Sequence, residues 1–114
     1  MILHTNLKHI ADSDQYEETL QENENVMICC GRMGPMCIPV YQSMIELESS
    51  YPGVAFCDFA FDTPEAHVIR QLPECRGFMG LPFTVYYKNG KVVSATSGIQ
   101  TKEQVQDILD REFA

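Results

Sequence analysis

Two segments of strand length that are apolar almost throughout constrain the fold of this chain most. Residues 26–30 contain no charged or amide side chain, and residues 54–61 contain a single acid. Such runs are typical of strands inside a sheet that is covered on both faces. Between them, apolar residues recur at helical spacing after Pro39: Val40, Met44 and Leu47. The pattern predicts a parallel unit of strand, helix and strand.

The flanking segments predict shorter elements. Residues 7–10 predict a first strand, and Ser13 is a suitable N-cap for a helix over residues 14–22, whose first turns are acidic. After residues 54–61, Pro64 is placed to open a short helix at its first position. The first two thirds of the chain therefore alternate strand and helix three times.

The last third predicts a hairpin followed by a helix. Residues 83–87 and 92–96 are strand-like and flank Asn89-Gly90, a pair typical of a tight hairpin turn. Thr101 is a candidate N-cap for a final amphipathic helix, with Glu103 close to the capping-box position. A parallel unit followed by a hairpin, under flanking helices, predicts an α/β three-layer sandwich with a central mixed sheet.

The charge balance argues against two classes of partner. The 114 residues include eight basic and sixteen acidic side chains, for a net charge of -8, and the basic ones are scattered. Binding to nucleic acid or to an anionic membrane requires clustered Lys and Arg. No segment approaches the roughly 18 apolar residues of a membrane span. We therefore expect no nucleic-acid partner and no membrane partner.

Domain organisation and location follow from similar considerations. No linker, repeat or low-complexity tract interrupts the chain, which predicts one domain over residues 1–114. Five cysteines, with Cys29 and Cys30 adjacent, make a poor disulfide scaffold and fit a reducing compartment. The first residues lack the basic start and apolar run of a signal peptide. We expect a cytoplasmic protein.

The order of elements and several local strings resemble the thioredoxin family from about residue 7 onward. Gly80-Leu81-Pro82, the strand after it, the Lys-Asn-Gly turn, the second strand, Gly98 and Thr-Lys-Glu-Gln are similar to the Gly-Ile-Pro-Thr region of that family and to its C-terminal segment. The resemblance implies a thioredoxin fold and a cis bond before Pro82, which would lie beside the active site.

The active-site segment differs from that family. Its Trp-Cys-Gly-Pro-Cys motif aligns with residues 32–36, so that both cysteines become methionines, and Met27 occupies the position of its buried aspartate. The ordinary dithiol mechanism therefore does not transfer residue by residue. Residues 72–79 suggest an inserted loop. By resemblance, six residues would contact a substrate: Met33, Gly34, Pro35, Met36, Leu81 and Pro82.

Cysteines near the altered motif suggest a different thiol site. Cys37 falls in the predicted first turn of the long helix, where free backbone amides and the helix dipole stabilise a thiolate. Strand alternation turns Cys29 and Cys30 to opposite faces, and Cys30 lies nearer the loop. We expect a thiol–disulfide oxidoreductase in cell redox homeostasis in which Cys37 attacks and Cys30 resolves, without a cofactor or metal. Its partners would be protein disulfide clients and a thioredoxin-reductase-like reductant.

Other side chains of the chain have plain structural explanations. Cys29 and Cys57 lie on apolar strands, where cysteine commonly serves as a small core residue. Cys75 could be a redox partner from across the site or an exposed bystander. Solvated faces account for Asp58 and Asp62. Arg32 could support a thiolate by its charge or be an exposed loop residue.

Two alternative functions use the same region. Soft sulfur ligands select Cu(I), which would make a metal-binding module from two thiols and two thioethers: Cys30, Met33, Met36 and Cys37. A non-catalytic module would instead hold an extended peptide in a groove lined by apolar side chains: Met33, Met36, Phe78, Met79 and Leu81. A reversible disulfide, Cu(I) uptake or neither would separate the three hypotheses.

Overall fold

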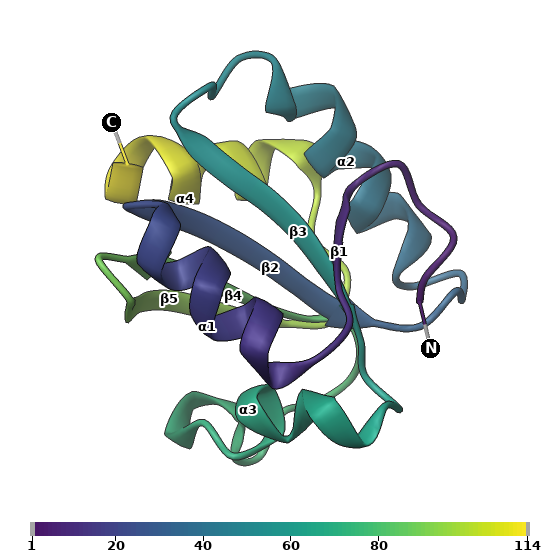
Figure 1. The fold of residues 1–114 in the computed structure, drawn as a ribbon. Helices are drawn as coiled ribbons and strands as arrows, with labels where there is room; N and C mark the ends of the chain where they lie inside the picture. The colour runs from purple at the N-terminus through teal and green to yellow at the C-terminus, as the bar shows by residue number, and fades with distance from the viewer. Residues whose placement is uncertain (1, 114) are drawn as a thin grey trace.

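A computed structural model describes residues 2–113 and contains one five-stranded mixed sheet. The strand order is β1-β3-β2-β4-β5, with β1, β3 and β2 parallel and with β4 antiparallel to both β2 and β5 (Figure 1). The apolar segments found in the sequence form its two central strands, β3 and β2. The bounds are β1 Lys8–Ile10, β2 Asn25–Gly31, β3 Val54–Ala60, β4 Phe83–Lys88 and β5 Lys91–Ser97.

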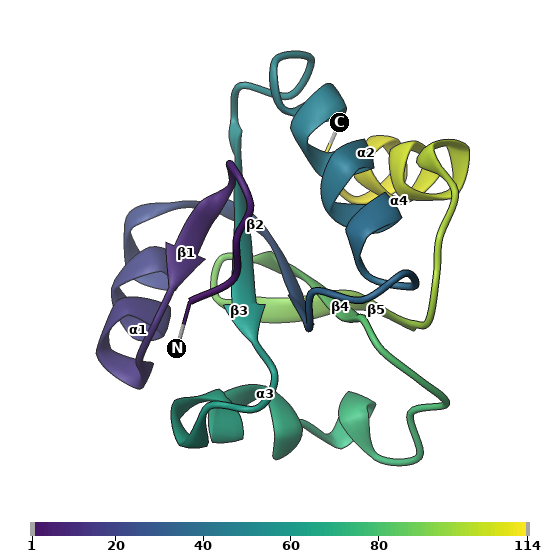
Figure 2. The same ribbon diagram turned by 90° about the vertical axis from the view of Figure 1, so that its right-hand side faces the viewer.

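Helices cover both faces of this sheet. Figure 2 shows α1 on one side and α2 with α4 on the other, while α3 lies beyond the end of β3. This arrangement confirms the α/β three-layer sandwich with a central mixed sheet. The helices are α1 Ser13–Glu22, α2 Ile38–Glu48, α3 His67–Arg70 and α4 Lys102–Phe113, with 3-10 turns η1 Pro64–Ala66 and η2 Pro73–Cys75.

Alternation along β2 divides the core in two. Met27 and Cys29 pack toward α2 and α4, together with Tyr41, Met44 and other buried residues. Ile28 and Cys30 pack on the opposite face, in the cluster that holds residues of α1 and α3. Two adjacent cysteines therefore belong to two separate cores.

The cap of α1 differs from the sequence prediction by one residue, whereas Thr101 caps α4 as predicted. Asp12, not Ser13, caps α1, and its side chain accepts a hydrogen bond from the Gln15 N–H at 2.8 Å. At α4, Thr101 forms its reciprocal capping pair with Gln104, not Glu103: the Thr101 N–H donates to Gln104 Oε1 at 2.8 Å, and the Gln104 N–H donates to Thr101 Oγ1 at 3.1 Å. Gln104 is the third residue after the cap, which is the position where a side chain can reach back to the cap N–H.

Asn89 and Gly90 form the tight turn between β4 and β5, which confirms the predicted hairpin. Both residues have positive φ, 53° and 78°, a conformation that Gly tolerates freely and Asn better than most residues. The turn places β5 at the edge of the sheet, beyond β4. Within residues 2–113, none of the helices combines the length and the apolar character that crossing a bilayer requires.

Candidate functional site

A cleft of about 410 Å³ lies between the start of α2 and the loop that precedes β4. Its lining comes from Arg32 and residues 34–37, from Phe61, and from the loop before β4: Phe78, Gly80 and Leu81. Of the six residues expected to contact a substrate, four line this cleft: Gly34, Pro35, Met36 and Leu81. Met33 lines a separate cleft of about 250 Å³, next to the N-terminal segment.

Cys37 forms part of the wall of this cleft. It is the N-cap residue of α2 and not part of its first turn, because the helix begins at Ile38 with Pro39 in its first turn. Its Sγ accepts a hydrogen bond from the backbone N–H of Arg32 at 3.4 Å, and the residue is only 3% exposed. The thiol therefore lies at the helix N-terminus with one backbone donor already directed at it.

Gly31, the last residue of β2, leaves space for this thiol. A Cβ atom at this position would lie 2.7 Å from Tyr41 Oη, 2.9 Å from Cys37 Sγ and 3.1 Å from Pro82 Cβ. The Leu81–Pro82 peptide bond is cis. Strand β2, helix α2 and the Pro82 loop thus meet at a point where only glycine fits without displacement. The glycine directly after an apolar run was the sequence signal for this close approach, and it was missed.

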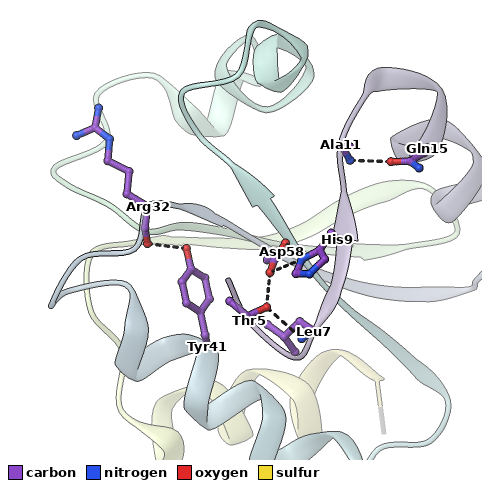
Figure 3. Close-up of polar contacts among 8 residues, drawn as sticks. All are labelled: Thr5, Leu7, His9, Ala11, Gln15, Arg32, Tyr41 and Asp58. Carbon is purple, nitrogen blue, oxygen red and sulfur yellow. Dashed lines mark hydrogen bonds and ion pairs between the residues drawn. The ribbon is translucent and has the colours of Figure 1, made fainter. Parts of the chain in front are cut away.

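Tyr41 holds the loop that carries Cys37 in place. Its hydroxyl donates a hydrogen bond to the Arg32 carbonyl at 3.0 Å, as Figure 3 shows. Burial raises the pKa of the Tyr41 hydroxyl, and charge on nearby Cys29, Cys37 and Asp58 raises it further. The hydroxyl therefore stays protonated and remains a donor at physiological pH. The helical stripe of apolar residues after Pro39 gives no sign of this polar role of Tyr41.

Removing this hydroxyl should loosen the loop without emptying the core. Tyr41→Phe is expected to lower the free energy of unfolding by about 0.5–1.5 kcal/mol, the usual net value of one hydrogen bond, measured by urea denaturation. The alkylation rate of Cys37 should change at the same time, because Arg32 supplies the N–H that contacts its sulfur. Tyr51→Phe, which removes an exposed hydroxyl bonded to Asp110, is the matched control. An unchanged alkylation rate in Tyr41→Phe would contradict the positioning role.

The structure does not bring Cys30 and Cys37 together. Cys30 belongs to the core cluster on the α1 face, whereas Cys37 and Cys29 belong to the cluster on the α2 face. Cys30 and Cys29 are both fully buried. The expectation that Cys30 would approach Cys37 followed from nearness to the loop. Gly31 lies between Cys30 and the loop in sequence, and alternation turns Cys30 to the far face.

All five cysteines are free thiols. Burial raises the pKa of the Cys57 thiol to about 12, and it raises the pKa of Cys29 well above its usual value. Cys29 and Cys57 are core residues, as expected. Cys75 is 4% exposed and therefore is not an exposed bystander. Burial raises its pKa too, and that of Cys30.

The four proposed copper ligands lie in three different places. Cys30 is buried on the α1 face, Met33 borders the smaller cleft, and Met36 and Cys37 border the larger one. Among residues 2–113, His, Cys, Asp and Glu form no group of three placed to hold a metal ion. Of these four candidate ligands, only Met36 and Cys37 border the same cleft, so at most these two could bind one soft cation.

The Arg32 guanidinium pairs with the carboxylate of Asp62. Its guanidinium donates two hydrogen bonds to Asp62, Nε to Oδ2 at 2.7 Å and an Nη to Oδ1 at 2.8 Å. This pair is exposed, and the guanidinium lowers the pKa of the Asp62 carboxyl. Arg32 is therefore an exposed loop residue whose backbone N–H contacts Cys37, and its charge also interacts with that thiol, although Asp62 is its main partner.

Asp58 is buried, which corrects the expectation of a solvated acid. It lies on β3 opposite Cys29 and is 1% exposed. Its carboxylate accepts hydrogen bonds from the Thr5 hydroxyl and from His9 Nδ1, the latter at 2.9 Å (Figure 3). The Leu7 N–H donates to Thr5 Oγ1 at 3.0 Å, so the network ties the N-terminal segment to the sheet. The single acid in an apolar strand was a signal for a buried carboxylate.

Asp58 should give the stability of the protein a distinct pH dependence. Burial raises its pKa, and the hydrogen bonds from Thr5 and His9 offset part of that increase. As pH rises above about 4, the unfolded chain loses the Asp58 proton first, so this carboxyl lowers the free energy of unfolding until pH passes the raised pKa. Asp58→Asn removes that decline. Urea denaturation from pH 4 to 8 measures the free energy of unfolding of the native protein and of Asp58→Asn. The value for the native protein should fall relative to the value for the variant as pH increases.

The matched control for this measurement is Asp107→Asn, at an exposed position of α4. The free-energy difference between this variant and the native protein should show no comparable decline, because Asp107 is exposed to solvent and is not desolvated by folding. A constant difference between native protein and Asp58→Asn over the same range would show that Asp58 titrates normally.

Comparisons with solved structures return thioredoxins. Thioredoxin O2 from Arabidopsis thaliana, in its oxidised state, superposes with a TM-score of 0.77 at 10% identity, covering 100% of both chains. The thioredoxin of Plasmodium falciparum gives a TM-score of 0.75 at 18% identity, over 93% of this chain and 99% of that one. Mitochondrial thioredoxin 3 from Saccharomyces cerevisiae gives 0.72 at 21% identity, over 91% and 94%. The sequence matches no protein-family model and no curated protein.

Proposed function

We propose that this chain, which has the thioredoxin fold, is a divergent thiol–disulfide oxidoreductase of cell redox homeostasis whose nucleophile is Cys37. One observation carries the proposal: Cys37 lies at the N-terminus of α2 in the wall of the cleft, and no other cysteine of residues 2–113 lines it. Helix N-termini favour thiolates, and the thiolate is the reactive form of cysteine. Similarity to solved thioredoxins supports the fold on which the proposal rests.

The cleft suits a protein disulfide better than a small polar molecule. Met36 is 50% exposed and Phe78 is 37% exposed, so the cleft presents large apolar side chains to its occupant. Apolar surface of this kind gives an extended peptide area to bury beside its reacting sulfur. The proposed clients are therefore proteins with an accessible disulfide flanked by apolar residues.

The proposed reaction is a stepwise exchange. The Cys37 thiolate attacks one sulfur of the client disulfide, a bond forms between the two sulfurs, and the other client sulfur leaves as a thiolate that takes a proton from water. Two thiols from outside the chain then complete the turnover. The first attacks the Cys37 sulfur and releases the client as a thiol, and the second attacks the first and releases Cys37, so that the outside pair leaves as a disulfide. Supply of these two thiols by a thioredoxin-reductase-like protein remains part of the proposal. Cys30 is not assigned the second step, because it lies on the opposite face of the sheet from Cys37.

A mapping experiment tests the nucleophile directly. The native chain is mixed with a short apolar peptide whose cysteine carries a 2-thiopyridyl disulfide, and the reaction is quenched with acid and digested. Mass spectrometry is expected to find the peptide attached to Cys37, with one equivalent of 2-thiopyridone released. Attachment first to any of the four other cysteines would refute the assignment: Cys29, Cys30, Cys57 and Cys75.

A docking module without chemistry is the second candidate, and the exposed residues around the cleft favour it. A cysteine-free peptide of the same sequence should then bind the native chain and should bind Cys37→Ser equally, as measured by calorimetry. Met36→Glu should weaken binding because it places a charge in the cleft wall. Met79→Glu is the control, since Met79 is 92% exposed and does not line the cleft. Binding without any thiol exchange would favour docking over the oxidoreductase.

A further inference from the structure

Cys30 and Cys75 are two thiols that the proposed exchange reaction does not use. Both belong to the core cluster on the α1 face of the sheet, and both are buried, 0% and 4% exposed. Cys30 comes from the C-terminal part of β2, and Cys75 ends the 3-10 turn η2 more than forty residues later. The fold therefore brings two cysteines from distant segments into one core, on the opposite face from Cys37.

A chain of contacts links the two cysteines. Cys30 pairs with Phe83 across β2 and β4, and the Phe83 ring lies edge-on to the Phe78 ring, with centroids 6.3 Å apart. The Phe78 N–H donates to the Cys75 carbonyl at 3.3 Å. The turn from Cys75 to Phe78 therefore packs over the strand position next to Cys30.

Arg70 places a positive charge near both thiols. Its guanidinium is held by the carbonyl oxygens of Phe61 and Thr63, at 2.8 and 3.0 Å. Burial raises the pKa of Cys30, charge on Cys75 raises it further, and Arg70 lowers it. Burial raises the pKa of Cys75 and Arg70 lowers it. Burial is the larger influence on both thiols, and Arg70 offsets part of it by favouring the thiolate on each.

We propose that Cys30 and Cys75 form a second thiol site, which closes to an intramolecular disulfide by reaction with a low-molecular-weight disulfide. One thiolate attacks the small disulfide, which forms a mixed disulfide and releases one small thiol. The other thiolate then attacks the cysteine sulfur of that mixed disulfide and releases the second small thiol. Two electrons pass to the small disulfide, and the two protons of the cysteines end on the released thiols.

The disulfide would fasten one wall of the cleft. Segment 71–80 carries Cys75 and also supplies Phe78 and Gly80 to the cleft, whereas Cys30 lies in the centre of the sheet. A covalent link between them removes independent motion of that segment. The proposal does not depend on the exchange reaction at Cys37, which lies on the other face.

The test maps disulfides in the full chain and in Cys37→Ser, equilibrated with oxidised and reduced glutathione, alkylated and digested. Both proteins are expected to contain a Cys30–Cys75 link under oxidising conditions and to lose it on reduction. Cys75→Ser should leave Cys30 as a free thiol. Cys57→Ser, which removes another buried cysteine of the same cluster, should keep the link. Free Cys30 throughout, a link to another residue, or glutathione on Cys75 without a link would each overturn the proposal.

Tryptic cleavage supplies a second readout. Arg76 is exposed and directly follows Cys75, so its side chain is available to trypsin. Cleavage of the bond after it also requires the backbone of the segment to open locally. The oxidised chain should be cleaved there several times more slowly than the reduced chain, whereas cleavage after exposed Arg111 should be unaffected. Equal cleavage rates after Arg76 would contradict the fastening of the segment.

Discussion

Replacing Cys37 with serine is expected to reduce disulfide exchange to the uncatalysed rate. The hydroxyl of serine is not ionised at neutral pH and does not attack a disulfide, so both the mixed disulfide and its turnover are lost. The fold should survive, because the change replaces one small buried atom at the N-cap of α2, where serine is a favoured residue. The rate of reduction of a protein disulfide by the chain with excess thiol measures the effect, and urea denaturation checks the fold.

Cys57→Ser serves as the matched variant for this experiment. Cys57 is also buried, but it lies on β3 in the other core cluster and does not line the cleft. Its exchange rate should remain near that of the native chain, with some loss of stability from a hydroxyl placed in an apolar core. Full activity in Cys37→Ser would exclude Cys37 as the nucleophile. Loss of activity in both variants would point to a general effect on folding.

Gly31→Ala is expected to have the largest effect among variants that leave every thiol in place. The added methyl group would lie 2.7 Å from Tyr41 Oη and 2.9 Å from Cys37 Sγ, so both side chains must shift. Overpacking of this kind costs about 1–3 kcal/mol of stability. Because the displaced atoms are the sulfur of the proposed nucleophile and the hydroxyl that holds its loop, the exchange rate should fall together with the unfolding free energy.

Gly34→Ala separates the steric effect at Gly31 from a general effect of a methyl group in this loop. A Cβ at Gly34 has no neighbour within 4 Å, so this variant should change stability by less than about 1 kcal/mol. Urea denaturation and the exchange assay are run on both variants. Equal stabilities for Gly31→Ala and Gly34→Ala would show that the junction of β2, α2 and the Pro82 loop adjusts freely.

Local patterns were sufficient for the elements of this fold. The apolar runs became β2 and β3, Asn89-Gly90 became the hairpin turn, and Thr101 capped α4. Each of these depends on side chains within a few residues of one another. The one-residue error at the cap of α1 arose where two neighbouring polar residues, Asp12 and Ser13, could satisfy the same backbone N–H.

The candidate site was harder to predict because its parts come from distant segments. Gly34, Pro35, Met36 and Cys37 were identified from the motif and line the cleft, whereas Phe61 enters it from the end of β3 and was missed. The long-range packing of α2 against the sheet decides that Tyr41 reaches the Arg32 carbonyl. No spacing within the sequence expresses that contact.

The sequence by itself determined the α/β class, the order of elements and the presence of thiols around an altered motif, because these depend on composition and local periodicity. Tertiary structure alone decided which thiols share a core: Cys37 with Cys29 on one face, and Cys30 with Cys75 on the other. It also decided that Asp58 is buried beneath the N-terminal segment. The physical reason is that burial and pairing depend on which loops and helices cover each end of a strand, and chain segments far apart in sequence supply that cover.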